Sequence, residues 1–515
     1  MASDMAPASV GAPGRGRPVG VLAVVLTLLM TLVVPAAPAA AVDPTPTPLV
    51  TGWLPNWATS TALAGVEGNA DLIGEASPFW YTARASGSTV SVTTTLAPEE
   101  TAAVLASLRA RGIAVLPSIA DGSAARAMAS VLKDPAARAA HVNQLVALVI
   151  SNGYEGIELD YEKFAFSDGS STWATTRPAW VDFVTELGDA LHAAGKRLAL
   201  AVPPMYDGTY TSSSGYWVYD YAGIAPVVDS LRIMTYDYSV SRPGPISPLA
   251  FLRRTLSYAV SAFPGARIRM GLPAYGRLWT ARRADGSPSI TGTCPATGVP
   301  GTTSFTTATA MTYLTTTAGT TPALRFDEAS GEMVATFAKE YAGLDAEGVA
   351  TSCVVDHEAW WVDARGVAAR MPLVTEFGLA GVAAWHLGGV DPESWAAMRA
   401  FAAGMTFVAP PPPTSRSSAS TVVEARPSTL TPKRGKKVTL RVQVTPGRKS
   451  VTVRRQMLVK GSWKTMSTKK TNAKGRVTFT FTWPKSDTSR TYRITTKKKG
   501  SLPAGRSAKF TLKTR

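Results

Sequence analysis

Short apolar runs alternate with longer helical patterns along most of this 515-residue chain, and this alternation constrains the fold more than any other feature. Several helical patterns start at Pro or an acid and stop at Gly, as helix ends prefer. Regular alternation of strand and helix predicts a parallel α/β fold. The predicted strands are Val50 to Leu54, Leu72 to Tyr81, Ala114 to Ile119, Gly156 to Tyr161, Arg197 to Val202, Ser230 to Thr235, Ile268 to Pro273 and Gly381 to Trp385. The predicted helices include Pro98 to Arg111, Pro135 to Asn152, Arg177 to Ala194, Pro248 to Ala262 and Ala364 to Phe377.

About eight strand–helix repeats fit a closed (β/α)8 barrel, the TIM barrel. The alternative is an open, doubly wound sheet, but no Gly-x-Gly-x-x-Gly follows an early strand, so the nucleotide-binding form of that alternative loses its main support. A barrel places its chemistry at the carboxyl ends of its strands. Three of these ends carry Glu162, the pair Tyr236 and Asp237, and Trp385.

Three acids, Glu158, Asp160 and Glu162, alternate with apolar residues at the end of one predicted strand. A strand projects them from one face, roughly 6.6 Å apart. An amphipathic strand at a wet sheet surface has the same alternation, so the stretch alone does not distinguish a site from a solvated edge. The barrel context favours a site.

The two ends of the chain differ from the barrel segment in composition. Arg15 and Arg17, an apolar run from Val19 to Val34 and the small residues before Val42 follow the pattern of a secretory signal. We predict a signal peptide over residues 1–41, cleavage after Ala41, and a secreted, extracellular or cell-wall-associated protein. The alternative, a transmembrane anchor, needs a run of roughly 20 apolar residues, which this segment does not reach. The barrel is then expected over residues 42–408.

Residues 409–424 are rich in Pro and Ser and read as a linker. Beyond them, short alternating runs predict a small all-β sandwich over residues 425–515, which resembles bacterial immunoglobulin-like modules in pattern only. From Thr414 onward there are 27 Lys or Arg against two acids, Glu424 and Asp487. Such a surface attracts polyanions, so anionic cell-wall polymers are candidate partners; a solvated face that keeps the domain soluble is the alternative.

Two cysteines, Cys294 and Cys353, are present, and in an exported protein such a pair is expected to be bridged. The bridge closes a loop of about 60 residues and stabilises the fold by roughly 4 kcal/mol on the chain-entropy model. The four histidines form no close His/Cys cluster, so we predict no structural zinc.

Several segments together resemble glycoside hydrolase family 18, the chitinases and related N-acetylglucosaminidases. The stretch 154–162 resembles the family signature Asp-x-x-Asp-x-Asp-x-Glu, and segments 234–237, 271–277 and 378–388 agree in order and spacing. The resemblance covers about residues 49–404. Segments 243–246 and 357–364 look most like the spore-cortex and peptidoglycan branch.

The resemblance implies substrate-assisted cleavage beside N-acetylglucosamine, in which the sugar's acetamido oxygen is the nucleophile and one protein acid suffices. Glu162 is the implied acid/base, and Asp160 and Tyr236 are implied to orient the acetamido group. Trp385 is the implied floor beneath the sugar and Asp237 lines the same subsite. No cofactor is implied, and we infer no obligate protein partner. The expected partner is an N-acetylglucosamine-containing polysaccharide.

Further residues near strand ends complete the expected substrate-binding set. Glu158, Trp53, Trp80 and Tyr275 are assigned to it. For Trp53 and Trp80, as for the aromatic residues Trp57, Tyr206 and Trp279, packing in the core is the alternative to lining further subsites.

Two features depart from the family pattern. Glu155 and Glu158 replace the first two aspartates of the signature, and we interpret this as altered tuning. Segment 116–122 lacks the Ser-x-Gly-Gly that is usual for the third strand, and this absence weakens the case for chitin itself as the substrate. The expected activity is hydrolysis of β-1,4 bonds in peptidoglycan or chitin-type glycans. The rival is a non-catalytic glycan-binding barrel, and the retained Glu162 favours the enzyme.

Overall fold

The computed structural model describes residues 48–405, 422–445, 448–486, 488–500, 504–507 and 509–515. The predicted signal peptide, residues 1–41, and most of the predicted linker lie outside the described residues. No helix in this described part is long and apolar enough to cross a membrane.

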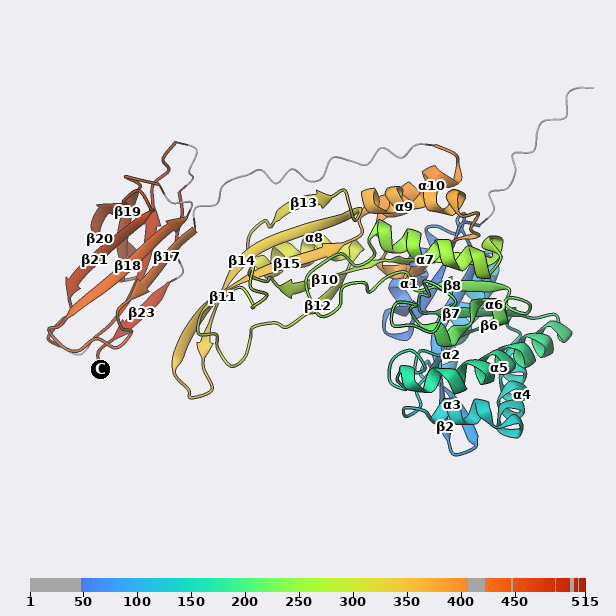
Figure 1. The fold of residues 1–515 in the computed structure, drawn as a ribbon. Coiled ribbons are helices and arrows are strands. Elements are labelled where there is room, and N and C mark those ends of the chain that lie inside the picture. The colour runs from blue at the N-terminus through green and yellow to red at the C-terminus, as the bar shows by residue number, and fades with distance from the viewer. Residues whose placement is uncertain (1–47, 406–421, 446–447, 487, 501–503, 508) are drawn as a thin grey trace, which may run out of the picture. The chain divides into compact units, whose positions relative to one another are not determined.

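Eight parallel strands close into a barrel, as the sequence predicted (Figure 1). Neighbouring strands pair in the order β1, β2, β5, β6, β7, β8, β9 and β16, and β16 pairs with β1 to complete the ring. Two short strands lie beside β2: β3 (Thr89–Thr94) pairs with it antiparallel and β4 (Ala114–Val115) parallel. The barrel strands are β1 (Val50–Pro55), β2 (Ile73–Ser86), β5 (Ser118–Asp121), β6 (Gly156–Asp160), β7 (Arg197–Val202), β8 (Ser230–Ile233), β9 (Ile268–Pro273) and β16 (Gly381–Trp385).

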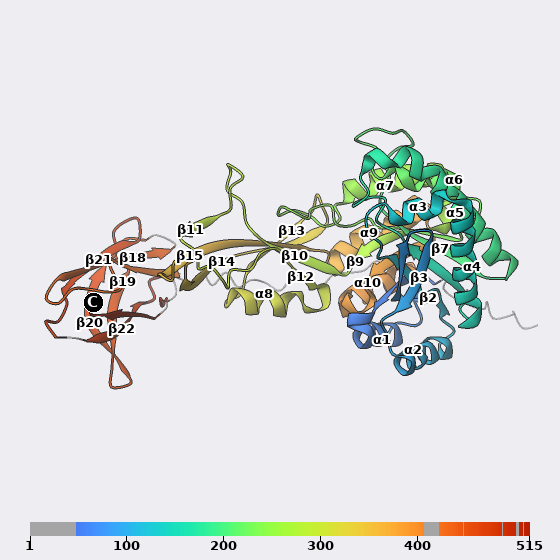
Figure 2. The same cartoon turned by 90° about the horizontal axis from the view of Figure 1, so that it is seen from below.

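Helices surround the barrel and bury its outer face (Figure 2). Capping residues define where several of these helices begin. At the start of α4 (Pro135–Ser151), the Asp134 carboxylate accepts hydrogen bonds from the N–H groups of Ala136 and Ala137, and Pro135 occupies the first turn. The helices are α1 (Thr59–Glu67), α2 (Pro98–Ala110), α3 (Ala127–Lys133), α4 (Pro135–Ser151), α5 (Trp173–Ala193), α6 (Tyr221–Ile224), α7 (Leu249–Ala262), α9 (Ala364–Glu376) and α10 (Pro392–Ala402).

An antiparallel sheet is inserted between β9 and α9, and the sequence did not predict it. Its strands pair in the order β12, β10, β15, β14 and β13, with β11 beside β15. Leu314 of α8 is buried in a small core with Leu278, Phe305 and Met333 of this sheet. The elements are β10 (Tyr275–Thr280), β11 (Ile290–Gly292), β12 (Thr303–Thr306), α8 (Ala310–Ala318), β13 (Ala323–Asp327), β14 (Glu332–Leu344) and β15 (Ala350–Trp361).

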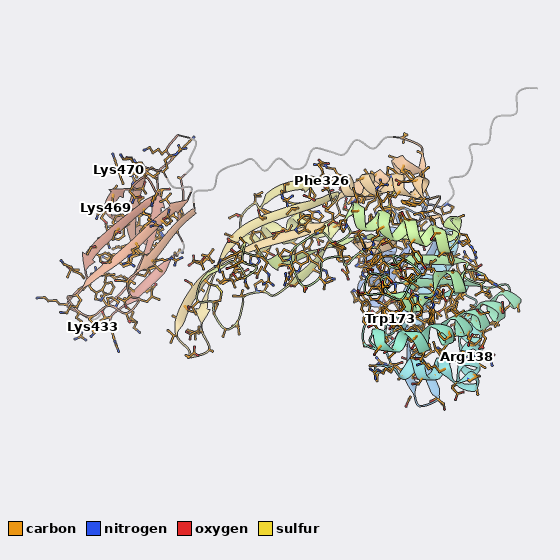
Figure 3. All side chains as sticks on the ribbon, in the orientation of Figure 1. Arg138, Trp173, Phe326, Lys433, Lys469 and Lys470 are labelled. Carbon is orange, nitrogen blue, oxygen red and sulfur yellow. A yellow bond between two sulfur atoms is a disulfide. The ribbon has the colours of Figure 1, made fainter. Side chains whose placement is uncertain are left out.

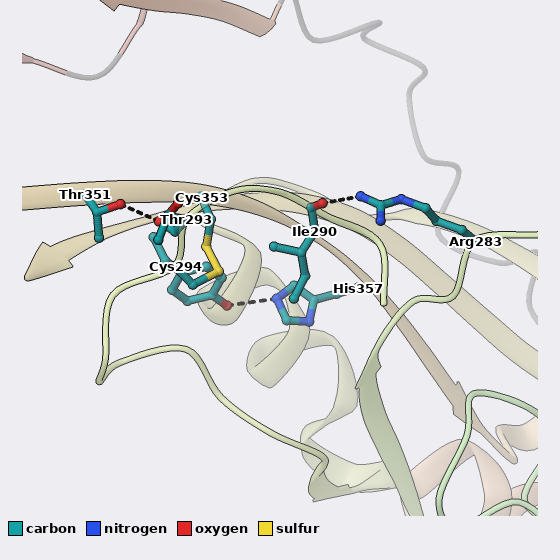
Figure 4. The surroundings of a disulfide bond; sticks show 8 residues. Arg283, Ile290, Thr293, Cys294, Thr351, Cys353 and His357 are labelled. Carbon is teal, nitrogen blue, oxygen red and sulfur yellow. Dashed lines mark hydrogen bonds between the residues drawn. A yellow bond between two sulfur atoms is a disulfide. The ribbon is translucent and has the colours of Figure 1, made fainter. Parts of the chain in front are cut away.

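A disulfide between Cys294 and Cys353 fastens this insertion internally (Figure 4). The two Cα atoms lie 4.7 Å apart, and the residues are separated by 59 positions. Close by, the Tyr341 hydroxyl and His357 Nε2 form a 2.9 Å hydrogen bond. The bridge therefore joins the loop after β11 to the first part of β15.

The C-terminal residues form a separate all-β unit with two antiparallel sheets. One sheet contains β17 (Val422–Pro427), β18 (Lys437–Thr445) and β21 (Arg476–Thr482). The other contains β20 (Ser462–Lys470), β19 (Thr452–Val459), β22 (Ser489–Thr496) and β23 (Phe510–Lys513). Its core includes Leu440, Val453, Phe479 and Ile494. Strand β17 begins at Val422, within the segment that the sequence assigned to the linker.

Candidate active site

Strand β6 places the three acids at successive depths in the barrel. All five residues of the strand, Gly156–Asp160, are buried. Glu158 is completely buried, Asp160 is 7 % exposed, and Glu162 lies two residues beyond the end of the strand and is half-buried. Because alternate residues of a strand share a face, the three side chains form a series that runs from the interior of the barrel to its mouth.

Tyr161 holds the chain in place immediately before Glu162. Its ring is buried against the helices, and its hydroxyl forms a 2.7 Å hydrogen bond with His141 Nε2. Its carbonyl accepts a 2.6 Å hydrogen bond from the Tyr219 hydroxyl. After Glu162 the chain turns, since the Glu162 carbonyl accepts hydrogen bonds from the N–H groups of Ala165 and Phe166. The backbone on both sides of the predicted acid is therefore fixed.

Glu158, which the sequence assigned to the substrate-binding set, is completely buried in the structure. Its carboxylate forms an ion pair with Arg232 of β8, which is also completely buried. It also accepts hydrogen bonds from Ser118 Oγ at 2.6 Å and from Trp53 Nε1 at 2.5 Å. Arg232 further contacts Glu75 and Ser77 of β2. Glu158 thus belongs to a closed polar layer inside the barrel.

Three tryptophans assigned or considered for sugar binding are also buried. Trp53 is 2 % exposed, its N–H is occupied by Glu158, and its ring supports Trp385 from 5.5 Å. Trp80 packs in the core among the helices because it points to the opposite side of β2 from Phe79. Trp279 is buried with Trp360 and donates to the Val240 carbonyl at 2.9 Å. Trp53 and Trp279 therefore pack against aromatic residues of the site, Trp385 and Tyr236 respectively, whereas Trp80 belongs to the barrel–helix core.

Asp160 and Glu162 hold protons more strongly than ordinary carboxyls. Burial raises the pKa of Asp160 well above its usual value, and the negative charges of Glu162 and Glu158 raise it further. Burial, followed by the charge of Asp237, raises the pKa of Glu162 to about 7. Asp160 Oδ1 is buried and has no hydrogen-bond partner in the described part of the chain. The pair can therefore carry a proton near neutral pH and still offer an acceptor oxygen.

Tyr236 and Asp237 follow β8 and connect the mouth of the barrel to the insertion. Asp237 has a left-handed backbone (φ 57°) and its carboxylate accepts hydrogen bonds from the Tyr275 hydroxyl and, at 2.6 Å, from Arg277 Nη2. The Tyr275 ring meets the Tyr236 ring edge to face, with centroids 6.1 Å apart. Burial raises the pKa of Tyr236 well above its usual value, so its hydroxyl remains protonated and can donate. Tyr275 therefore positions Asp237 and Tyr236.

A cavity of about 370 Å³ opens beside Glu162, and its walls are largely aromatic. A second aromatic group surrounds Trp385, whose ring lies 5.3 Å from Phe79 and 6.3 Å from Trp57; the Trp57 side chain is exposed. Aromatic faces and a few polar groups are the usual lining of a ligand site. The cavity is lined by Glu162, Phe166, Pro203, Pro204, Tyr206, Tyr216, Met234, Tyr236, Asp237, Tyr238, Val240 and Phe251.

The structure brings Glu162, Tyr236, Asp237 and Tyr206 to one cavity, but sequence reasoning missed several neighbours. Phe79 could have been found, because strand alternation sends it to the opposite side from Trp80. Arg232 lies within a predicted strand, and only ring closure shows that it meets Glu158. Phe166 and Tyr216 lie on loops whose course the sequence pattern does not define.

Comparison with known proteins identifies the family of this chain. The family model for Glycosyl hydrolases family 18 matches residues 83–389. The chain belongs to glycosyl hydrolase family 18. The Bacillus subtilis protein YdhD is 29 % identical over 273 residues, 52 % of this chain and 54 % of YdhD. The cortical fragment-lytic enzyme of Bacillus subtilis is 26 % identical over 269 residues, with the same shares covered.

This family 18 chain spans about half the length of these curated relatives. Solved structures share its fold. A chitinase from Chromobacterium violaceum ATCC 12472 superposes with a TM-score of 0.54 at 23 % identity, over 68 % of this chain and 98 % of that one. The Bacillus megaterium QM B1551 spore cortex-lytic enzyme SleL gives 0.53 at 18 % identity, over 69 % and 74 % of the two chains.

Proposed function

We propose that this protein is a secreted glycosidase that cleaves β-1,4 bonds beside N-acetylglucosamine by substrate-assisted, retaining catalysis. The observation that carries the proposal is the pair at the end of β6. Glu162, whose pKa is raised to about 7, lines an aromatic cavity, and Asp160 beside it has an unpartnered buried oxygen. A general acid works best when its pKa is near the working pH.

Each group of the site has a role in this reaction. Glu162 protonates the glycosidic oxygen while the substrate's acetamido oxygen attacks the anomeric carbon, forming an oxazolinium ion and releasing the leaving sugar. Asp160 accepts a hydrogen bond from the acetamido N–H and offsets the positive charge that develops. Deprotonated Glu162 then takes a proton from water, which attacks the anomeric carbon from the face that the leaving sugar vacated. The bond between that carbon and the acetamido oxygen breaks, and the acetamido group is restored. The anomeric configuration is retained because two inversions occur.

Tyr236 and Trp385 hold the reacting sugar. The protonated Tyr236 hydroxyl donates to the acetamido oxygen and directs it toward the anomeric carbon. The Trp385 ring, supported by Trp53 and Phe79, presents an apolar surface for the axial C–H groups. With the sugar held in this way, the acetamido oxygen as nucleophile and Glu162 as acid are sufficient for cleavage.

Peptidoglycan and chitin-type glycans both contain the required N-acetylglucosamine. Support for the first comes from the cortical fragment-lytic enzymes among the relatives, and support for the second from a class V chitinase of Arabidopsis thaliana that is 24 % identical over 190 residues. The signal pattern at residues 1–41 supports secretion. The proposal includes attachment to anionic cell-wall polymers through the basic C-terminal unit.

The test is mass spectrometry of the products formed by the full chain from purified peptidoglycan and from chitin oligomers, in H₂¹⁸O. New N-acetylglucosamine reducing ends that carry one ¹⁸O are expected from at least one glycan, and the Glu162→Gln variant should yield almost none. Cleavage by the variant at the wild-type rate refutes the assignment of Glu162. Tight binding of both glycans without cleavage by the wild type favours the rival, a non-catalytic glycan-binding barrel.

A further inference from the structure

The outer side of the β17–β18–β21 sheet carries a cluster of arginines. Arg426, Arg441 and Arg476 line one hollow of about 380 Å³, together with Gln443 and Thr478. We call these five residues the arginine face. Their sequence neighbours Leu440, Val442 and Phe479 are buried in the core, so strand alternation turns the arginine face outward.

The strand register brings these cations close together. Arg441 lies directly opposite Arg426 on β17 and opposite Thr478 on β21, while Gln443 lies opposite Arg476. Directly opposed side chains have Cβ atoms about 5 Å apart. The register therefore places three arginines on neighbouring strands of one side of the sheet.

The Arg476 guanidinium is already oriented in the free protein. Its Nε donates to Gln443 Oε1 at 3.0 Å, and Gln443 Nε2 in turn donates to the Lys474 carbonyl at 2.8 Å. Within the described residues, the two terminal nitrogens of Arg476 make no hydrogen bond, and Arg441 contacts no carboxylate. Lys469, labelled in Figure 3, donates to the Thr478 carbonyl at 2.8 Å, which places an ammonium beside strand β21.

We propose that the arginine face binds the phosphates of a phosphodiester-linked polymer without bases, such as a poly(glycerol phosphate) chain. Guanidinium forks match phosphate oxygens, and threonine hydroxyls add donors. Arg426 and Arg441 lie one strand spacing apart, about 4.8 Å, and Arg476 lies on the next strand, two residues out of register with Arg441. Closely spaced anions of one polymer can therefore reach all three. No aromatic residue lines the hollow, so it offers no platform for stacked bases.

This inference rests on the proposed attachment to cell-wall polymers and deepens it, because it names the ligand chemistry and the residues. Diffuse attraction by the whole basic unit is the competing explanation. The two differ in one respect: a built site depends on which arginines are removed, whereas diffuse attraction depends only on how many charges are removed.

The experiment measures binding of a fluorescent oligo(glycerol phosphate) to the full-length protein by anisotropy, over a range of salt concentrations. Arg441→Gln with Arg476→Gln removes two charges from the arginine face. Arg454→Gln with Lys464→Gln removes two charges from the other sheet and is the matched control. Arg441→Lys with Arg476→Lys keeps the charge but loses the forks. Circular dichroism checks that each variant is folded.

The arginine-face double variant should bind at least about 10-fold more weakly. The slope of log affinity against log salt concentration should fall by the amount expected for about two lost phosphate contacts. The control should change less than about 2-fold, and the lysine variant should fall between the two. Equal losses in variant and control overturn the proposal in favour of diffuse charge. Equal or tighter binding of poly-glutamate or of single-stranded DNA overturns the phosphodiester assignment.

The same samples separate this inference from the proposed hydrolase. Cleavage of a soluble chitin oligomer should be unchanged in the arginine-face variant, because the substitutions lie outside the barrel. If the wild type binds the polymer site-specifically but cleaves no glycan, the hydrolase proposal fails and the binding site stands. If the wild type cleaves glycans but binds no polymer, the binding-site proposal fails and the hydrolase proposal stands.

Discussion

Acidic side chains form two layers inside the barrel, and the layers differ in whether a cation pairs with the acids. The lower layer is deep in the barrel, and the upper layer is at its mouth. In the lower layer, Glu158 and Glu75 surround Arg232 and are paired with it. Burial raises the pKa of Glu158, but the charge of Arg232 opposes that rise. In the upper layer, Asp160 and Glu162 form no ion pair with a residue that the structure describes, and burial raises the pKa of both without such opposition. Strand β6 supplies Glu158 to the lower layer and Asp160 to the upper one, and Glu162 follows two residues after the strand ends. Placement relative to a buried cation therefore decides whether an acid in this barrel is structural or reactive.

The largest expected effect is on catalysis in the upper layer. Glu162→Gln keeps the shape of the side chain but removes the transferable proton, so kcat/KM should fall by about 10³-fold. The measurement is the initial rate of cleavage of a chitin oligomer or a peptidoglycan fragment. Glu358→Gln on the insertion is the matched control and should retain activity within about 2-fold. A fall of less than 10-fold for Glu162→Gln would place the acid elsewhere.

In the lower layer the main effect should be on stability. Arg232→Met leaves Glu158 and Glu75 buried without their shared cation, which should lower the free energy of unfolding by roughly 3–5 kcal/mol. Urea unfolding at pH 7 measures this. Adding Glu158→Gln to Arg232→Met should recover part of the loss, because one uncompensated buried charge disappears. The two-layer distinction fails if Arg232→Met is as stable as the wild type.

Ionisation of Glu162 in the upper layer should lower the free energy of unfolding. The pKa of Glu162 is raised from 4.5 to about 7 on folding, so the folded state retains a proton that the unfolded state has lost between these pH values. The free energy of unfolding should therefore fall as pH rises from about 4.5 to 7, by about 3 kcal/mol at most. Glu162→Gln lacks this loss. The variant should match the wild type near pH 4 and exceed it at pH 8; equal stability of the two proteins at both pH values would contradict the raised pKa.

The smallest effect should come from the link between the insertion and the mouth of the barrel. Tyr275→Phe removes the hydroxyl that donates to Asp237 but leaves the ring against Tyr236. We expect a loss of about 3- to 10-fold in kcat/KM, since a single hydrogen bond contributes about 1 kcal/mol. The thermal midpoint should move little. A loss as large as that of Glu162→Gln would mean that Tyr275 contacts the substrate itself.

Much of the barrel could be predicted from sequence, because buried parallel strands are short apolar runs and their helices begin and end at recognisable residues. The insertion could not: its strands are interrupted by Thr-rich loops, and the sheet pairs segments far apart in the chain, such as β10 with β15. Trp53 and Glu158 were placed at the correct strand but not at the correct depth. Depth depends on which residues of the neighbouring strands, here Ser118 and Arg232, close over them.

The central claim, that Glu162 keeps its proton near neutral pH while Glu158 below it is structural, can be tested by carbon-13 NMR of the protein labelled at glutamate carboxyl carbons. The Glu162 resonance is the one that disappears in Glu162→Gln. The account predicts that this resonance titrates with an apparent pKa near 7. Titration near 4.5, the value of an ordinary glutamate, would contradict it.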